Sequence, residues 1–139
     1  MVSNVSYGDM TVDEIPGLSL ALAVTGEVLD LRVQLMDRSL IEFEIVVPSV
    51  LAALCVKTLG WASRRAPKDA YDVWRLLRVF RTRIDQSHEW RAGGVEGDAA
   101  KVLLSDFAQV NGTGVKTATR VAAERAEVRA LALYALGAQ

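Results

Sequence analysis

Apolar and polar residues alternate along two stretches in the first third of the chain. In residues 28–35, leucine and valine occupy every second position, and charged or amide side chains lie between them. Residues 40–47 repeat the alternation around Phe43. A period of two residues indicates a half-buried strand. Because only the short polar break 37–39 follows the first strand, the pattern predicts an antiparallel hairpin.

Residues 18–24 are a shorter apolar stretch that follows the Pro16-Gly17 turn. They fit either a third strand or a short helix, since a few apolar residues show no distinct period. We expect an extended segment.

From Pro48 onward the apolar positions recur with helical spacing. Pro48 fits the first turn of a helix, where its missing N–H has no partner to lose. Four helices are expected, at about residues 48–63, 67–83, 98–110 and 116–136. Residues 91–97 should form a flexible connection and not a phosphate-binding loop, because no Gly-x-x-x-x-Gly-Lys pattern follows.

Strands followed by helices predict an α+β fold in which the helices cover one face of a small sheet. The chain has 139 residues, of which 51% are hydrophobic and 24% charged, as in one globular domain with a core. We expect a single domain, 1–139, that is β-rich over 1–47 and α-helical over 48–139.

Charge is unevenly distributed although the net charge is only −1. Residues 57–83 carry eight basic and two acidic side chains. The single cysteine, Cys55, fits a reducing cytoplasm, and no apolar run approaches the roughly 20 residues that span a bilayer. The single histidine, His88, has no second metal ligand nearby in the sequence and is expected to be a solvated loop or helix-end residue.

Lys57 is the first candidate functional residue. On a helical wheel its ammonium group falls on the apolar stripe formed by Val50, Leu54 and Trp61. Its stem can lie along the core while the charge reaches water or a carboxylate. Alternatively, the lysine is aimed at a ligand that bears phosphate.

Two carboxylates occupy the start of the apolar face of the next helix. Asp69 and Asp72 share that face with Val73, Leu76 and Phe80. Asp near a helix start can cap free N–H groups, a role that fits Asp69 better than Asp72. If the two helices pack antiparallel, Asp72 can approach the lysine of the preceding helix and form either a salt bridge or one edge of a site.

These residues resemble the C-terminal portion of AbiEii/AbiGii-type nucleotidyltransferases, a family that includes toxins of toxin–antitoxin pairs. The resemblance covers roughly residues 15–80. Its elements are the helix bearing Lys57, then Arg64 or Arg65, the run Lys68-Asp69-Ala70-Tyr71-Asp72-Val73, and upstream Ile15-Pro16-Gly17-Leu18 and Val47-Pro48-Ser49. It implies transfer of a nucleoside monophosphate from a nucleoside triphosphate to an acceptor such as a tRNA.

The resemblance also implies roles for individual residues. Lys57 and Lys68 would contact the nucleotide phosphates, and Asp72, with Asp69, would orient or deprotonate the attacking hydroxyl. The nucleic-acid contacts would come from the arginines of the two helices, Arg64, Arg65, Arg75 and Arg78.

The family holds Mg²⁺ and the triphosphate with an Asp-x-Asp pair, because clustered carboxylates are the ligands that Mg²⁺ needs. Asp30-Leu31-Arg32 has arginine at the second position of that motif, and Asp9 and Asp13 have the wrong spacing. We therefore expect no metal ligands and no bound cofactor in this chain, which would start downstream of the metal site and be inactive alone.

Several partners follow from this expectation. They are an N-terminal catalytic half supplied in trans, an antitoxin-like protein, a tRNA, and a second copy held through exposed apolar surface. No membrane partner is expected.

Two other interpretations remain open. Arg75, Arg78 and Arg81 form a basic stripe with which a non-catalytic module could contact nucleic acid or another partner, although such a stripe also suits a solvated helix face. Alternatively, the run 68–72 is a coincidence in an unrelated α+β domain.

Overall fold

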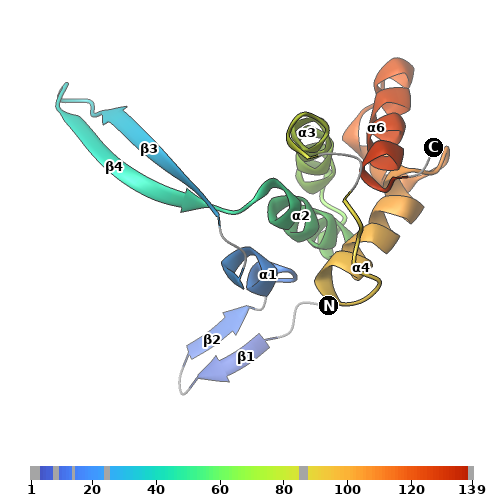
Figure 1. The fold of residues 1–139 in the computed structure, drawn as a ribbon, viewed down its shortest axis with the longest axis horizontal. Coiled ribbons are helices and arrows are strands. Elements are labelled where there is room, and N and C mark those ends of the chain that lie inside the picture. Colours follow the sequence, from blue (N-terminus) through green and yellow to red (C-terminus); the bar gives the residue numbers. More distant parts are fainter. Residues whose placement is uncertain (1–3, 8–9, 14, 24–25, 85–87, 138–139) are drawn as a thin grey trace.

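The computed structural model describes residues 4–7, 10–13, 15–23, 26–84 and 88–137. Two antiparallel hairpins and a set of helices make up the fold (Figure 1). The strands are β1 (Asn4–Tyr7), β2 (Met10–Asp13), β3 (Glu27–Gln34) and β4 (Leu40–Val47). The helices are α1 (Leu18–Ala23), α2 (Val50–Arg64), α3 (Pro67–Arg83), α4 (Gly94–Val102), the π-helix η1 (Leu103–Phe107), α5 (Thr113–Ala118) and α6 (Ala122–Ala135). The α+β class is confirmed.

The hairpin predicted from the alternating pattern is present. β3 and β4 pair antiparallel along their whole length, from Glu27 opposite Val47 to Gln34 opposite Leu40. At its turn, Asp37 Oδ1 accepts hydrogen bonds from the Ser39 N–H and hydroxyl, at 2.9 and 2.6 Å. These bonds lower the pKa of the Asp37 carboxyl. The shorter β1–β2 hairpin had no counterpart among the predicted elements.

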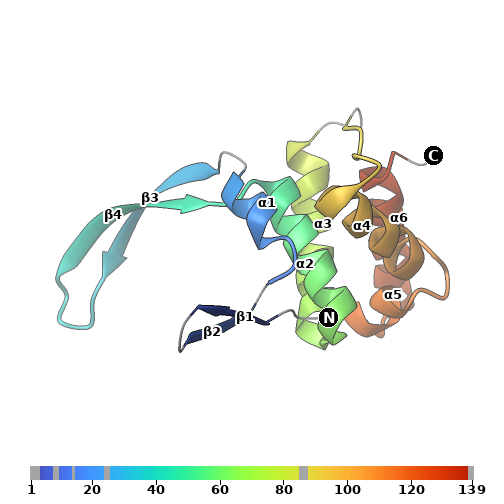
Figure 2. The ribbon, with the colours of Figure 1, turned by 90° about the horizontal axis from the view of Figure 1, so that it is seen from below.

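The expectation that helices cover one face of the sheet is wrong for β3–β4. The hairpin extends away from the helices in both views (Figures 1 and 2), and we call it the arm. Its apolar face is open: Val33, Ile41 and Phe43 are 39%, 43% and 44% exposed. Alternation predicted one apolar face correctly, but it carries no information about what covers that face.

The two helices at the centre of the fold lie close to where they were expected. α2 begins two residues later than predicted, at Val50, because Ser49 caps it by accepting the Ala52 N–H at 3.2 Å. α3 spans the predicted residues, with Pro67 in its first turn. Arg65 joins them with a left-handed backbone, φ 54°. The helices therefore turn back on each other and pack antiparallel.

Residues 18–23 form the helix α1 instead of the extended segment that we expected. Gly17, with φ 86°, turns the chain before it, and the Leu18 N–H bonds to the Ile15 carbonyl at 3.0 Å. Gly17 also lies directly against Val56 of α2. This close packing, together with the helix-forming leucines and alanines, favours the helix.

The C-terminal helices are divided differently from the prediction. α4 starts at Gly94, inside the expected connection 91–97, and continues into η1, where the Ala108 N–H bonds to the Leu103 carbonyl. The single helix expected over 116–136 is two helices. The break is at Thr119, whose hydroxyl accepts the Val121 N–H at 3.1 Å and also pairs with Glu124.

The hydrophobic core lies between α2, α3, η1 and α6. Its largest fully buried side chains include Trp61, Phe80 and Phe107. The rings of Trp61 and Phe107 meet edge to face, with centroids 5.9 Å apart. In the described part of the chain, no helix combines the length and the hydropathy needed to cross a membrane. The core therefore fixes α2 and α3, and these two helices carry the candidate site.

Candidate functional site

A groove of about 630 Å³ lies where α1, α2 and α3 meet beside the root of the arm. Pro48, the first residue after β4, is one of the lining residues. Most of its wall is apolar, with Leu18 from α1, Val56 from α2 and Val79 from α3. The charged lining side chains are Lys57, Asp72, Arg75 and Arg78.

Lys57 and Asp72 meet at this groove, as the two-helix packing predicted. Lys57 Nζ donates to Asp72 Oδ2 at 2.7 Å. The lysine side chain is 38% exposed and the aspartate side chain 20%. A single ion pair leaves two of the three ammonium protons for other acceptors. The arrangement can therefore offer positive charge to an anion while Asp72 holds the lysine in place.

Two arginines stand on the same groove, with different surroundings. Arg78 is paired with Glu127 of α6. Nε and Nη2 of the arginine donate to the Glu127 carboxylate at 2.8 and 2.7 Å. These hydrogen bonds raise the pKa of Arg78 and lower the pKa of Glu127. The guanidinium also stacks over the Trp74 ring at 4.5 Å. Arg75 is exposed and makes no ion pair with any described residue.

Asp69 does not join Asp72 at the groove. Its carboxylate is almost fully buried and accepts three hydrogen bonds from Arg64, at 3.0 to 3.1 Å. This pair links the last turn of α2 to the first turn of α3. Asp69 and Arg64 thus stabilise the connection between the helices, and neither lines the groove.

Arg65 is likewise held by the fold. It pairs with Asp106 of η1 and donates to Thr113 Oγ1 at 3.1 Å. Asp106 also accepts the indole N–H of Trp61 at 2.8 Å. These contacts fix the end of α2 to the C-terminal helices. Arg64 and Arg65 therefore both hold the C-terminal end of α2 in place.

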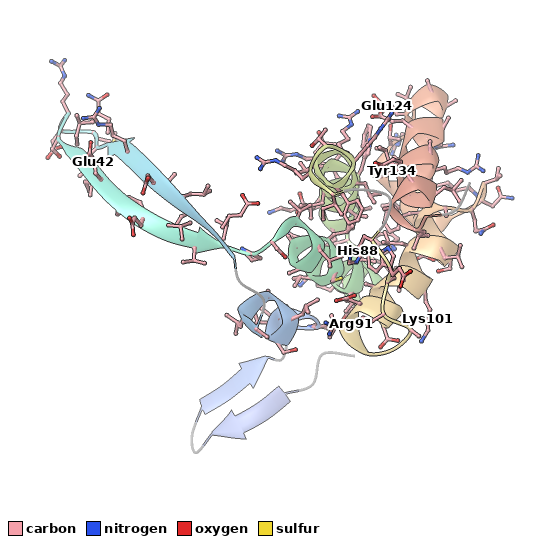
Figure 3. All side chains as sticks on the ribbon, viewed as in Figure 1. Glu42, His88, Arg91, Lys101, Glu124 and Tyr134 are labelled. Atoms are coloured by element: carbon pink, nitrogen blue, oxygen red, sulfur yellow. The ribbon has the colours of Figure 1, made fainter. Side chains whose placement is uncertain are left out.

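The remaining predicted residues lie elsewhere. Lys68 is exposed in the first turn of α3 and does not line the groove. Arg81 lies over the ring of Tyr134, which Figure 3 labels on α6, at 5.9 Å. His88 is less exposed than expected: its ring packs against Trp90 and Phe80, and Nε2 is buried without a hydrogen-bond partner among the described residues.

The donor set does not match the Mg²⁺ that the resemblance implies. Among the residues that the structure describes, no three carboxylate, histidine or cysteine side chains come together as metal ligands. The two carboxylates of the resemblance are separately engaged, Asp72 by Lys57 and Asp69 by Arg64. The described residues therefore do not fit a bound Mg²⁺.

The sequence pattern did not identify the apolar half of the groove. Leu18 and Ala21 line it only because residues 18–23 are helical, and an extended segment was expected there. The available signal for an apolar groove wall was an apolar residue, such as Val79, among the charged residues on the outer side of a helix. Comparison of the chain with protein-family models, with curated proteins and with solved structures found no match.

Proposed function

We propose that the groove between α1, α2 and α3 binds a nucleotide. The chain would then be the C-terminal portion of an AbiEii-like nucleotidyltransferase, which transfers a nucleoside monophosphate to an acceptor such as a tRNA. The metal-binding carboxylates would come from a second polypeptide. The observation that carries the proposal is the Lys57–Asp72 pair, at 2.7 Å, on the wall of a groove of about 630 Å³.

The chemistry of a nucleotide fits the lining of this groove. Ligand pockets are typically about 300–1,000 Å³ and mostly apolar, with a few oriented polar groups. The apolar walls formed by Val56 and Val79 suit the faces of a base, and Lys57 with Arg75 supplies charge for phosphate oxygens. Asp72 positions Lys57 and, in the complete enzyme, would orient the attacking hydroxyl.

Nucleotide binding by the full chain tests the proposal. Calorimetric titration with each nucleoside triphosphate should show binding to the parent chain. The affinity should fall at least about tenfold in Lys57→Met, because the variant loses one charge-assisted contact of about 1.4 kcal/mol or more. Lys68→Met is the matched control, because Lys68 is exposed outside the groove. Equal losses in both variants, or in neither, would contradict the assignment.

Asp72→Asn tests whether the charge of Asp72 is needed for nucleotide binding. The amide keeps the shape of the side chain and an oxygen that can accept from Lys57, and it removes a negative charge beside the expected phosphates. We expect triphosphate binding that is as tight as in the parent chain or tighter. A weaker affinity in a variant with an unchanged melting temperature would show that Asp72 has a different role.

The chain alone, with Mg²⁺, tRNA and labelled nucleotide, is expected to show no incorporation. The reason is the donor set: no described group of side chains could hold the metal. Incorporation that disappears in Asp72→Ala would overturn the second half of the proposal and leave the nucleotide site intact.

A second candidate function is contact with nucleic acid through Arg75, Arg78 and Arg81. It is favoured by Arg75, which is exposed and makes no ion pair with a described residue. The other two arginines face α6, one bound by Glu127 and one over Tyr134. The stripe thus offers less free charge than its spacing suggests. Salt-dependent tRNA binding that Arg75→Ala and Arg81→Ala each reduce would support this function.

A further inference from the structure

We propose that the apolar face of the arm, residues 27–47, packs onto the α1–α2–α3 groove of a second copy of this chain, and that the exchange is reciprocal. The inference concerns assembly and does not depend on nucleotide binding. It begins from the arm itself. A two-stranded hairpin in water is marginal without a covering element, and here both faces and both edges are open.

The uncovered face is continuous along the arm. Three successive cross-strand pairs lie on it, Leu29 with Ile45, Leu31 with Phe43, and Val33 with Ile41. Leu29, Val33, Ile41 and Phe43 are each 39–44% exposed. The opposite face carries the charged pairs, and Figure 3 places Glu42 on the arm well away from the helices. The apolar stripe therefore needs an apolar counterpart.

The described helices of the same chain do not cover the arm. It leaves the helical body at Pro48, which itself lines the groove, and it extends outward from there (Figures 1 and 2). Only Pro48 and Ser49 lie between β4 and α2, and with this link the apolar face of the arm stays open. A second copy can bring its groove to the arm and receive an arm in return, which gives a closed twofold dimer.

The groove can take part of the arm. An eight-residue strand rises about 26 Å, whereas the lining residues of α3, from Asp72 to Val79, span about 12 Å of the helix. The groove wall presents apolar side chains, including Val56, Leu76 and Val79. One groove can thus cover about half the length of one arm.

Charge decides between the two possible arrangements of a dimer. Residues 27–47 carry five acidic and two basic side chains, whereas the groove is lined by three basic side chains, Lys57, Arg75 and Arg78, and one acidic side chain, Asp72. Packing arm against arm would bring two acidic hairpins together. Packing arm against groove brings the acidic hairpin beside the basic helices, within about a Debye length of 8–10 Å.

The oligomeric state of the full chain tests the proposal. Sedimentation over micromolar to sub-millimolar concentrations should show a monomer–dimer equilibrium that weakens as salt is added. Val33→Asn/Phe43→Asn on the apolar face should raise the dimer dissociation constant at least about tenfold, or 1.4 kcal/mol. Val28→Asn/Val46→Asn, on the opposite face, is the matched control and should leave it unchanged.

A second variant identifies the surface that the arm contacts. Val79→Asp places a carboxylate in the groove, at a position already 41% exposed, and should also produce monomers. Mixing this variant with Val33→Asn/Phe43→Asn should restore a weaker heterodimer, because the intact arm of one chain meets the intact groove of the other. Dimers that persist in Val79→Asp would mean arm-to-arm packing and would overturn the proposal. So would a parent chain that remains monomeric throughout.

The arm-face variant also keeps this test apart from that of the nucleotide site. Its groove is intact, so nucleotide titration of its monomer reports on the groove alone. If both proposals hold, a partner's arm and a nucleotide exclude each other, and added nucleotide shifts the parent chain toward monomer.

Discussion

At the scale of single residues, Cys55 shows how strongly the core controls chemistry. Its thiol is fully buried in α2, and this burial, with the nearby Glu96, raises its pKa to about 12. Because the thiolate is the reactive form, the native chain should react with a disulfide reagent at pH 8 orders of magnitude more slowly than the unfolded chain. Stopped-flow labelling with and without denaturant measures this. Rapid labelling of the native chain would contradict the burial.

Asp69 supports a second prediction at this scale. Asp69→Asn removes a nearly buried charge that accepts three hydrogen bonds from Arg64. We expect a loss of about 1–2 kcal/mol in the free energy of unfolding by urea, at the lower end because Arg64 is 56% exposed and keeps access to water. Glu42→Gln breaks an exposed pair with Arg32 and should cost less than about 1 kcal/mol. Similar losses in both variants would contradict the assignment.

Residue patterns predicted part of the site for identifiable reasons. Lys57 and Asp72 stood out because charge on an apolar helix face requires a partner, and the antiparallel packing of two joined helices brought them together. The same pattern grouped Asp69 with Asp72. A helical wheel of α3 shows only the residues of that helix, so it does not show that the end of α2 lies beside Asp69. Arg64, in the last turn of α2, captures Asp69 there. Which of two neighbouring carboxylates is free depends on tertiary contacts.

At the scale of elements, the contact between α5 and η1 depends on one glycine. A Cβ added to Gly114 would lie 2.5 Å from Cζ of the buried Phe107. Gly114→Ala should therefore destabilise the chain by about 1–3 kcal/mol in thermal or urea unfolding. Gly60→Ala is the comparison: its methyl would lie 3.2 Å from Nη2 of Arg64, which needs to shift by only a few tenths of an ångström in its pair with Asp69, and the gain in helix propensity of up to about 1 kcal/mol should offset this. An unaffected Gly114→Ala would mean that α5 does not pack as described.

Element boundaries were predictable where a local signal was strong. Pro67 and Pro48 marked the starts of α3 and α2; α3 begins at Pro67, and α2 begins two residues after Pro48. Thr119 divides the last helical segment through side-chain bonds to Val121 and Glu124, and such a capping threonine looks, in sequence, like any other polar helix position. The helicity of residues 18–23 depends on packing against α2, which no local pattern contains.

At the scale of the whole molecule, the fold consists of a packed helical body and an arm that the body does not cover. Alternation along β3 and β4 correctly predicted an apolar face, and the expected covering helices were wrong because both α2 and α3 use their apolar faces for a shared core with α6 and η1. The other apolar side chains of the two helices, including Val56, Leu76 and Val79, line the groove, and the arm of the same chain does not cover them.

Hydrogen exchange distinguishes the stability of these two parts. Local opening of a lone hairpin costs little free energy, whereas core helices open only near global unfolding. In the parent chain, the partner's groove should protect the backbone amides of β3 and β4. In the monomeric Val79→Asp variant, those amides should exchange much faster, while the amides of α2 and α3 keep their protection. Mass spectrometry of peptides from both regions provides the measurement. Arm amides that exchange at the same rate in both chains would show that the groove does not hold the arm, since no other described element packs along it.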